Sequence, residues 1–586
     1  MLTPIETKQF TVSGSGSVNW SVDGLVGGSP STGTITPTGL YSPPTSNGTH
    51  TVTVTTSDSL SSSSATVYVT SYPGTFTHYI DNSRTGQNLN ETVLTPANVS
   101  ATTFGKLATY SIDGIAHASP LYVAGVNLPG LGLRNVVYIG TEHNSMYAFD
   151  ADAASGSPLW RVSFINPAGG VTAVPAGDTG ECCDIAPEIG ITGTPVIDRT
   201  NGTLYVVAKT KEVVGGTTRY VQRLHALDVA TGAEKFGGPV VLQANVPGTG
   251  NGSTNGTVPF DSLHQNQRAG LLLSNGVVYI AFASHGDIQP YHGWILAYNA
   301  TTLQQVLAYN ATPNGEGAGI WQSGAGLAAD SAGNIYFTTG DGKFDANTGG
   351  KDYGDSFMKL DAAGAVLDYF TPFNQNNLDV NDVDLGSGGV LLLPDQSGAH
   401  PHMVVSAGKN GVIYLIDRDN MGHYNGSNND QAVQTLVNIF PFGTPEPGNY
   451  SAPAYFNGTV YFSPVNDNIQ AFKLTNGLFN PSPVSRSAAV YAYPGGALAI
   501  SASGSANAIL WSVERDATAV SDGDSSRPGV LHAYDPANLA TELYNSDQSG
   551  SRDRLSPAAK FSAPVVANGK VFVATVNTLT IYGLLP

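Results

Sequence analysis

The sequence predicts an all-β protein in which an eight-bladed β-propeller follows a small β-sandwich. Three observations support this fold class. Only 12% of the 586 residues are charged, 41% are hydrophobic, and 69 glycines and 35 prolines punctuate the chain, a composition typical of short strands joined by turns. One strand pattern recurs along most of the chain. The opening of the chain follows a different, shorter pattern.

Residues 1–73 alternate apolar and polar residues with period two, as half-buried strands do. Turns rich in proline, serine, asparagine and glycine separate the segments, and Trp20 can fill a core between two sheets. This region resembles a bacterial immunoglobulin-like repeat, and we interpret it as an immunoglobulin-like β-sandwich that serves as a spacer or attachment module. The expected strands cover residues 10–13, 18–22, 33–36, 50–54 and 65–70.

Residues 74–586 repeat a unit of an apolar strand, a Gly or Asn turn, a Val/Tyr-rich strand and a strand ending in Ala-x-Asp or a related triplet. Such units stack into a closed ring that leaves no long sheet edge unpaired. We expect residues 76–111 to supply the outer strand that the last unit lacks. A right-handed β-helix would need shorter, more uniform repeats. The eight units include residues 136–150, 202–228, 276–299, 333–361, 411–417, 458–473, 499–535 and 569–582.

Charge and hydropathy limit the possible partners and locations. Acidic residues outnumber basic ones by 44 to 25, and a net charge of −19 argues against a nucleic-acid partner. No apolar run is long enough for a membrane span. Residues 1–6 show no export signal, but the low lysine content, the polar composition and the negative charge predict a secreted, periplasmic or cell-surface protein. The oligomeric state stays open.

The two cysteines, Cys182 and Cys183, are neighbours in the chain. Adjacent cysteines exclude a disulfide framework and a zinc site built from spaced cysteine pairs. If they are bonded to each other, their sulfurs offer a flat, polarizable surface for a planar ligand. If they are reduced, they are two small hydrophobic residues. The sequence leaves both alternatives open.

The Cys-Cys-Asp-Ile segment at 182–185 and the strand-forming stretch at 193–207 resemble the pyrroloquinoline quinone (PQQ) alcohol dehydrogenases, eight-bladed propellers that include methanol dehydrogenase. The resemblance implies a disulfide between Cys182 and Cys183 that covers one face of the quinone. The family continues with an arginine that contacts a cofactor carboxylate, whereas residues 186–190 contain Glu188, which we expect to repel an anionic quinone. The Cys-x-x-Cys-His motif of a fused haem is absent.

The same resemblance assigns the opposite face of the quinone and the metal. Trp321 is similar in placement to the tryptophan beneath the quinone, and Asp341 takes the place of the asparagine that binds calcium. An aspartate keeps a hard oxygen donor, so the resemblance implies a Ca2+ near Asp341. The family's metal-binding glutamate aligns with Ile288, and Asp287, one residue away, is the candidate ligand there.

The family's catalytic base is the first aspartate of an Asp-x-Trp-Asp segment, for which residues 378–389 are the counterpart. Asp384 matches the second aspartate, and the first aligns with an asparagine. Because a general base must be ionisable, the neighbouring Asp382, or Asp379, is the candidate base, and we take Asp382 and Asp384 as the candidate catalytic residues. Lys409 precedes an Asn-Gly turn and matches the cation that bonds the quinone oxygens.

These residues support a first hypothesis, an exported oxidoreductase that uses PQQ and Ca2+ to oxidise a small-molecule alcohol or sugar. A second hypothesis is a non-catalytic propeller that binds a partner such as a surface glycan, because nearly every catalytic position departs from the family pattern. A third is a polysaccharide-active lyase or hydrolase that uses His285, His292 and Arg268. Since propellers host many functions, the fold alone does not choose among them.

Overall fold

The computed structural model describes residues 1–13, 17–58, 60–180, 184–441, 448–518, 521–522 and 526–585. Strands form nearly all of the regular structure in these ranges, which confirms the all-β fold class. Helices within the described chain are short and lie in connections between strands. They are α1 (Gln375–Val380) and the 3₁₀ helices η1 (Pro167–Gly169), η2 (Ala176–Thr179), η3 (Gln322–Gly324), η4 (Ala346–Thr348) and η5 (Leu385–Ser387).

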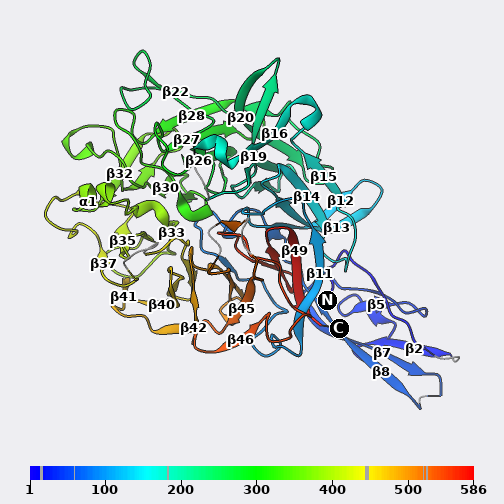
Figure 1. Ribbon diagram of the computed structural model, residues 1–586. Coiled ribbons are helices and arrows are strands. Elements are labelled where there is room, and N and C mark those ends of the chain that lie inside the picture. Colours follow the sequence, from blue (N-terminus) through cyan, green and yellow to red (C-terminus); the bar gives the residue numbers. More distant parts are fainter. Residues whose placement is uncertain are drawn as a thin grey trace.

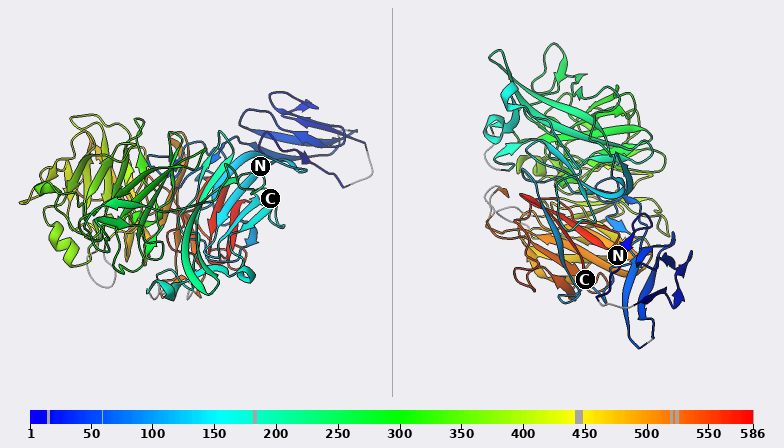
Figure 2. Two further views of the ribbon diagram at one scale, coloured as in Figure 1. Left: turned by 90° about the horizontal axis from the view of Figure 1, so that it is seen from above. Right: turned by 90° about the vertical axis from the view of Figure 1, so that its right-hand side faces the viewer.

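The N-terminal region forms two four-stranded sheets with the orders β3-β2-β7-β8 and β1-β6-β5-β4. Trp20, Tyr41 and Val52 are buried between them, as the alternating pattern predicts. Figure 2 shows this sandwich, in dark blue, projecting beside the labelled chain ends. That it is immunoglobulin-like stays a prediction. The strands are β1 (Lys8–Gln9), β2 (Val18–Val22), β3 (Leu25–Val26), β4 (Gly28–Ser29), β5 (Gly33–Ile35), β6 (Leu40–Ser42), β7 (Gly48–Thr56) and β8 (Ser62–Val69).

Two mainly antiparallel sheets, sheet 1 and sheet 2, begin the propeller. The hairpin β19–β20 of sheet 2 has strands of 12 residues each. Sheet 1 contains β9 (Gly74–Thr75), β12 (Leu121–Leu128), β13 (Gly132–Gly140), β14 (Ser145–Asp150) and β15 (Trp160–Ser163). Sheet 2 contains β16 (Val171–Pro175), β17 (Glu188–Ile189), β18 (Val196–Asp198), β19 (Thr203–Val214), β20 (Thr217–Asp228) and β21 (Val240–Val241).

A two-stranded ribbon, β22 (Asn245–Pro247) with β23 (Thr257–Pro259), lies in the connection to sheet 3. Sheet 3 contains β24 (Gln265–Asn266), β25 (Leu272–Ser274), β26 (Val277–Ser284), β27 (Trp294–Asn299) and β28 (Gln305–Asn310). Sheet 4 contains β29 (Ala328–Ala329), β30 (Ile335–Thr338), β31 (Phe357–Leu360), β32 (Val366–Thr371) and β36 (His423–Tyr424).

Sheets 5 and 6 continue the same order. Sheet 5 contains β33 (Leu391–Leu392), β34 (Met403–Ala407), β35 (Ile413–Asp417) and β37 (Gln434–Leu436). Sheet 6 contains β38 (Ala454–Phe456), β39 (Thr459–Phe462), β40 (Asp467–Thr475), β41 (Leu478–Phe479) and β42 (Ser485–Tyr491).

Sheets 7 and 8 each combine strands from both ends of the chain. Sheet 7 contains β10 (Gln87–Asn88), β43 (Ala497–Ser503), β44 (Ala506–Glu514), β45 (Val530–Tyr534) and β46 (Glu542–Asn545). Sheet 8 contains β11 (Phe104–Ser111), β47 (Val565–Ala567), β48 (Lys570–Ala574) and β49 (Thr578–Leu584). The pairing of β11 with β49 confirms that residues 76–111 supply an outer strand to the last sheet.

Clusters of buried apolar side chains join these sheets into a ring. Within the described residues, each of eight clusters contains residues from two consecutive sheets. The cluster of Tyr122, Phe149, Phe572 and Ile581 joins sheet 8 back to sheet 1. In Figure 1 the colours accordingly run round the ring until red β49 lies beside blue β11. Each sheet buries both faces against its neighbours. Closure of the ring therefore leaves no described repeat with an apolar face exposed to solvent.

Residues 76–88, which we call the axial segment, run past the innermost strand of sheet after sheet. After β9 pairs with β12 of sheet 1, the segment bonds in turn to sheets 2 through 8. It therefore crosses the middle of the ring before β11 supplies the outer strand that the sequence predicts for residues 76–111. Its bonds join Phe76 to Ile197, Asn82 to Leu273 and Ala329, Ser83 to Leu392, Thr85 to Tyr455, Gly86 to Ile500, and Asn88 to Val566.

Candidate functional site

Three carboxylates that the sequence singles out converge at the ends of inner strands. One oxygen from each of Asp341, Asp382 and Asp384 lies within 4.8 Å of the others. Asp341 follows β30, Asp382 follows α1, and Asp384 precedes η5. The backbone N–H of Asp341 donates to Oδ1 of Asp384 over 2.8 Å, which fixes the two residues relative to each other. We call these three residues the acidic cluster.

A glycine allows this close approach. A β-carbon at Gly340 would collide with Oδ1 of Asp384 and would lie 3.2 Å from Cδ1 of Trp321. The Gly-Asp pair at 340–341 therefore serves a contact between two sheets as well as a turn. The same contact places the indole of Trp321 beside the acidic cluster.

Lys409, in the turn between β34 and β35, is the cation of this group. Its Nζ lies 2.5 Å from Oδ1 of Asp382 and 2.7 Å from Oδ2 of Asp384. Burial opposes its charge, but Asp384 and Asp382 outweigh that effect and raise the pKa of Lys409 above its ordinary value. The side chain of Asp382 is 69% exposed and that of Asp384 is 8% exposed, so only Asp382 faces solvent.

The acidic cluster still carries more negative than positive charge. Burial first, and then the carboxylates of Asp384 and Asp355, raise the pKa of Asp341 to about 12. Burial and Asp384 likewise raise the pKa of Asp355 well above its ordinary value. Oδ1 of Asp341 is buried and has no hydrogen-bond partner among the described residues. A bound cation would supply the missing partner, since carboxylate oxygens are the ligands that hard cations prefer.

Asp287 lies near the acidic cluster without being part of it. Its Oδ1 accepts a hydrogen bond of 2.9 Å from Ser284. Burial, followed by the carboxylate of Asp384, raises the pKa of Asp287. Among the described residues, the group of carboxylates close enough to share an ion excludes Asp287. A role for Asp287 as a direct metal ligand stays a prediction.

Trp321 comes directly before η3, in which Gln322 and Ser323 both have positive φ. The indole Nε1 is buried and has no hydrogen-bond partner in the part of the chain that the structure describes. Gly340 lies near both Trp321 and Asp384, and a β-carbon at Gly324 would be 3.4 Å from Nη1 of Arg268. This turn therefore connects the two halves of what we call the axial site, the acidic cluster and the basic residues around Arg268.

Cys182 and Cys183 lie outside the described residues, but their neighbour Asp184 is well anchored. Nζ of Lys560 donates to both the backbone oxygen and Oδ1 of Asp184, each over 2.6 Å. Burial opposes ionisation, but Lys560, Arg268 and His117 together lower the pKa of Asp184. The guanidinium of Arg268 lies 4.1 Å from the ring centre of Phe561, a cation–π contact.

A second buried network completes this basic half of the site. His117 bridges two carboxylates, with Nδ1 2.6 Å from Glu142 and Nε2 2.8 Å from Asp522. Nε of Arg515 lies 2.6 Å from Oδ1 of Asp522. Burial works against protonation, but the two carboxylates prevail and raise the pKa of His117. We call His117, Glu142, Asp184, Arg268, Arg515, Asp522 and Lys560 the basic network.

Glu188 has a histidine partner, and its expected repulsion of a quinone stays a prediction. Its Oε1 lies 2.7 Å from Nδ1 of His143, and its backbone pairs with Pro175 in β16. An imidazole therefore stands next to the carboxylate. Arg268 and Lys560 supply buried cations near Asp184 and can compensate for the arginine that the family pattern has at 186–190.

The histidines of the third hypothesis serve structural contacts. Nε2 of His292 lies 2.9 Å from the backbone oxygen of Asn251, and Nδ1 lies 3.0 Å from Oγ1 of Thr312. Nε2 of His285 lies 2.8 Å from Nζ of Lys209. Burial lowers the pKa of both histidines. Arg268 belongs to the basic network, and a shared catalytic role for these three side chains stays a prediction.

The comparison with known families decides the relationship. A family model described as "PQQ: Glucose/ethanol/alcohol dehydrogenase, beta-propeller domain" matches residues 116–423, more than half of the chain. The chain belongs to this PQQ dehydrogenase propeller family. Trp321, Asp341, the carboxylates at 382 and 384, and Lys409 all lie inside the matched range. The resemblance drawn from the short motifs is thereby confirmed.

Several solved structures are similar to this chain in fold. A quinohemoprotein alcohol dehydrogenase, ADHIIG from Pseudomonas putida HK5, is 14% identical with a TM-score of 0.56, over 87% of this chain and 80% of its own. A europium-containing methanol dehydrogenase is also 14% identical, with a TM-score of 0.43 over 86% and 81%. BamB from Moraxella catarrhalis is 12% identical, with a TM-score of 0.44 over 82% and 99%.

No curated protein matches the chain. Within the described residues, no helix has the length and apolar character needed to cross a membrane.

Proposed function

We propose that this member of the PQQ dehydrogenase propeller family is a quinone-dependent oxidoreductase that oxidises an alcohol or a sugar. The observation that carries the proposal is the meeting of Trp321, Lys409 and the acidic cluster beside one another. An indole face, a cation and hard oxygen donors are what a planar anionic quinone with a metal ion requires. The composition and the family support an exported location.

The residues at the acidic cluster fit a Ca2+ ion. Asp341, Asp382 and Asp384 would hold it. The buried Oδ1 of Asp341 has no hydrogen-bond partner among the described residues, and a cation would provide one. When bound, the ion would act as a Lewis acid on a quinone oxygen, and the quinone would accept the electrons of the substrate. Carboxylates that repel one another without an ion become its ligands when an ion binds.

The walls of the site fit the quinone itself. Trp321 would support one face, and Cys182 and Cys183 remain the predicted cover of the other. Lys409 would donate to oxygens at one end of the ring system. Arg268 and Lys560 would attract the carboxylates at the other end, because both are buried cations near Asp184. Lys409 would thus lie near the oxygens of the quinone, and Arg268 and Lys560 near its carboxylates.

Asp382 would carry out the proton transfer. A general base must reach the hydroxyl proton of the substrate, and its exposed carboxylate can do so. Lys409 orients that carboxylate through the 2.5 Å contact. Asp384, largely buried and bonded to the N–H of Asp341, would act as a positioning residue. Asp379, the other candidate base, lies outside the group of described carboxylates close enough to share an ion, which makes it the weaker choice.

Reconstitution tests this proposal directly. The purified full chain is incubated with PQQ and Ca2+ and assayed for dye reduction with a panel of alcohols and sugars. We expect Ca2+-dependent PQQ binding and turnover. Asp382→Asn should keep PQQ binding and lose at least about a hundredfold in rate, because a positioned general base contributes that much. Absence of both binding and turnover would overturn the proposal.

A non-catalytic propeller is the second candidate. It is favoured by one specific observation, that Asp287 does not join the group of carboxylates able to share an ion. In that case the axial site would bind no PQQ, and the acidic cluster would be a remnant neutralised by Lys409. Failure of PQQ to bind the wild-type chain, with Ca2+ present, would favour this function over the oxidoreductase.

A further inference from the structure

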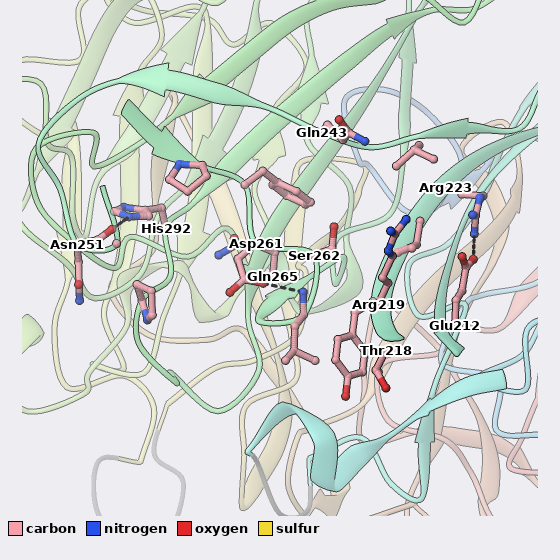
Figure 3. Close-up of a pocket in the computed structure, with 18 residues that line it drawn as sticks. Glu212, Thr218, Arg219, Arg223, Gln243, Asn251, Asp261, Ser262, Gln265 and His292 are labelled. Carbon is pink, nitrogen blue, oxygen red and sulfur yellow. Dashed lines mark hydrogen bonds and ion pairs between the residues drawn. The ribbon is translucent and has the colours of Figure 1, made fainter. Parts of the chain in front are cut away.

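A groove on the outer part of sheets 2 and 3 is not used by the axial chemistry. Its cavity volume is about 830 Å³. One wall is strand β20, and the other is formed by the β22–β23 ribbon and the segments at 260–265 and 290–292. Figure 3 shows the two walls, with Thr218 and Arg219 on one side and Asn251 and His292 on the other.

On the β20 side, the groove is bordered by the unpaired edge of this strand and not by a face of the sheet. Four consecutive residues, 218–221, line the groove. Successive side chains of a strand point to opposite faces, so consecutive lining residues indicate a groove that runs along the strand. On this side β20 pairs with β21 only at Arg223 and Leu224. Beyond that point no strand among the described residues covers the edge.

The register tells which backbone groups face the groove. The N–H of Leu242 donates to the carbonyl of Gln222 on the side of β21. Because antiparallel pairing alternates, the backbone groups of Thr218 and Tyr220 point the same way as those of Gln222. In the described structure nothing bonds to the N–H or C=O of either residue. Two residues therefore present four unused backbone bonding groups.

The opposite wall is held in place before any ligand arrives. Nε2 of His292 contacts the backbone oxygen of Asn251, whose N–H donates to Gly315. The N–H of Phe260 donates to Ala244 across the base of the groove. A preformed wall reduces the ordering cost of binding. The contact made by His292 thus maintains the groove.

The β20 edge also carries a cation, Arg219. Arg219 is exposed and, within the described residues, makes no hydrogen bond and no ion pair. Glu212 lies directly across from it in β19 but is bonded to Arg223. In a chain with a net charge of −19, an available guanidinium at a binding edge favours an acidic group on the ligand.

We infer that this groove binds an extended peptide segment of a partner protein, which adds as a strand to β20 and places an acidic side chain against Arg219. Backbone bonding groups at a strand repeat match a polypeptide, whereas a sugar chain has no such repeat. Thr218 and Tyr220 would supply the main-chain bonds. The inference does not depend on the axial chemistry.

The test uses a phage-displayed library of random heptapeptides selected against the full chain. We expect enriched peptides that carry an aspartate or glutamate. Thr218→Pro together with Tyr220→Pro removes the two outward N–H groups and leaves the ladder to β19 intact, because proline is tolerated at outward-facing edge positions. This double variant should bind the selected peptides at least about tenfold more weakly. Thr218→Val with Tyr220→Phe keeps the backbone and is the matched control.

Three further measurements keep the inference testable if the proline variant folds poorly. Amide hydrogen exchange should slow at Thr218 and Tyr220 when the peptide is bound. A peptide methylated on the backbone nitrogens that face β20 should fail to bind, and one methylated on the alternate nitrogens should still bind. Arg219→Ala should weaken an acidic peptide and leave its glutamine counterpart unaffected.

Several results would overturn the inference. One is a library that yields no binder. Another is a set of peptides that bind the proline and control variants equally. Binding of an oligosaccharide panel in the groove, unchanged in the proline variant, would assign it to carbohydrate. Concentration-dependent self-association that the proline variant abolishes would assign the edge to a second copy of the chain.

Discussion

The acidic cluster and the basic network both have residues near the Trp321 turn, but their buried charges are paired differently. In the basic network the carboxylates are paired, for example Glu142 and Asp522 with His117. In the acidic cluster, the single ammonium of Lys409 forms ion pairs with Asp382 and Asp384, and none of the described residues forms one with Asp341. Buried charge is tolerated when it is paired. The buried carboxylates of the basic network already have cationic partners. The acidic cluster has more carboxylates than cations and is therefore suited to bind a further cation.

The largest effect is expected in the basic network. His117→Gln would leave Glu142 and Asp522, each 1% exposed, without the cation between them. We expect the free energy of unfolding to fall by about 3–5 kcal/mol, as when one member of a buried ion pair is removed. Chemical denaturation measures the change, and added Ca2+ should not reverse it.

His532→Gln is the matched control for that variant. His532 also stands between two carboxylates, but Glu514 and Glu542 are 37% and 29% exposed. Solvent can stabilise them, so the loss should be only about 1 kcal/mol. Equal losses in the two variants would show that the burial of the His117 network is not what makes it important.

A smaller effect is expected when the acidic cluster loses its lysine. Lys409→Met should cost about 2 kcal/mol, because Asp384 becomes an unpaired buried carboxylate while the exposed Asp382 can be hydrated. Here Ca2+ should restore most of the stability, since it replaces the lost charge. Thermal unfolding with and without Ca2+ provides the measurement. If Ca2+ has no effect on either the wild type or the variant, the cluster is not a cation site.

Stability should also depend on pH through Asp341 of the acidic cluster. The folded state holds the proton of Asp341 more tightly, with a pKa of about 12, than an unfolded aspartate, which titrates near pH 4. The stability from this group is therefore complete below about pH 4 and is lost progressively as the pH rises. Asp341→Asn should flatten that slope and raise the free energy of unfolding at neutral pH without Ca2+.

Denaturation curves from pH 4 to pH 9 check this expectation, and Asp368→Asn, at a carboxylate outside the acidic cluster, is the control. A wild-type slope that Asp341→Asn leaves unchanged would mean that other groups cause it. A weaker affinity of the variant for Ca2+, measured by calorimetry, should accompany the gain in stability.

Much of the fold could be predicted from the sequence because each repeat shows its own strand pattern. The same holds for Trp321, Asp341 and Lys409, which stand in short motifs at strand ends. Lys560 and Asp522 could not be predicted, since their partners lie 376 residues and 405 residues away in the chain. Only ring closure brings them together. Asp355 sits in a loop without a motif, and its importance comes entirely from burial near Asp384.

The axial segment is synthesised before most of the strands to which it bonds. Its inner-strand partners are spread from Ile197 to Val566, so most of them do not yet exist when residues 76–88 leave the ribosome. Residues 76–88 therefore stay exposed to solvent until the last strands are synthesised. Strand β11 likewise stays unpaired until β49 is synthesised. Contacts of such high sequence separation form slowly. Chaperone protection of the growing chain is therefore most valuable before the eighth sheet is complete.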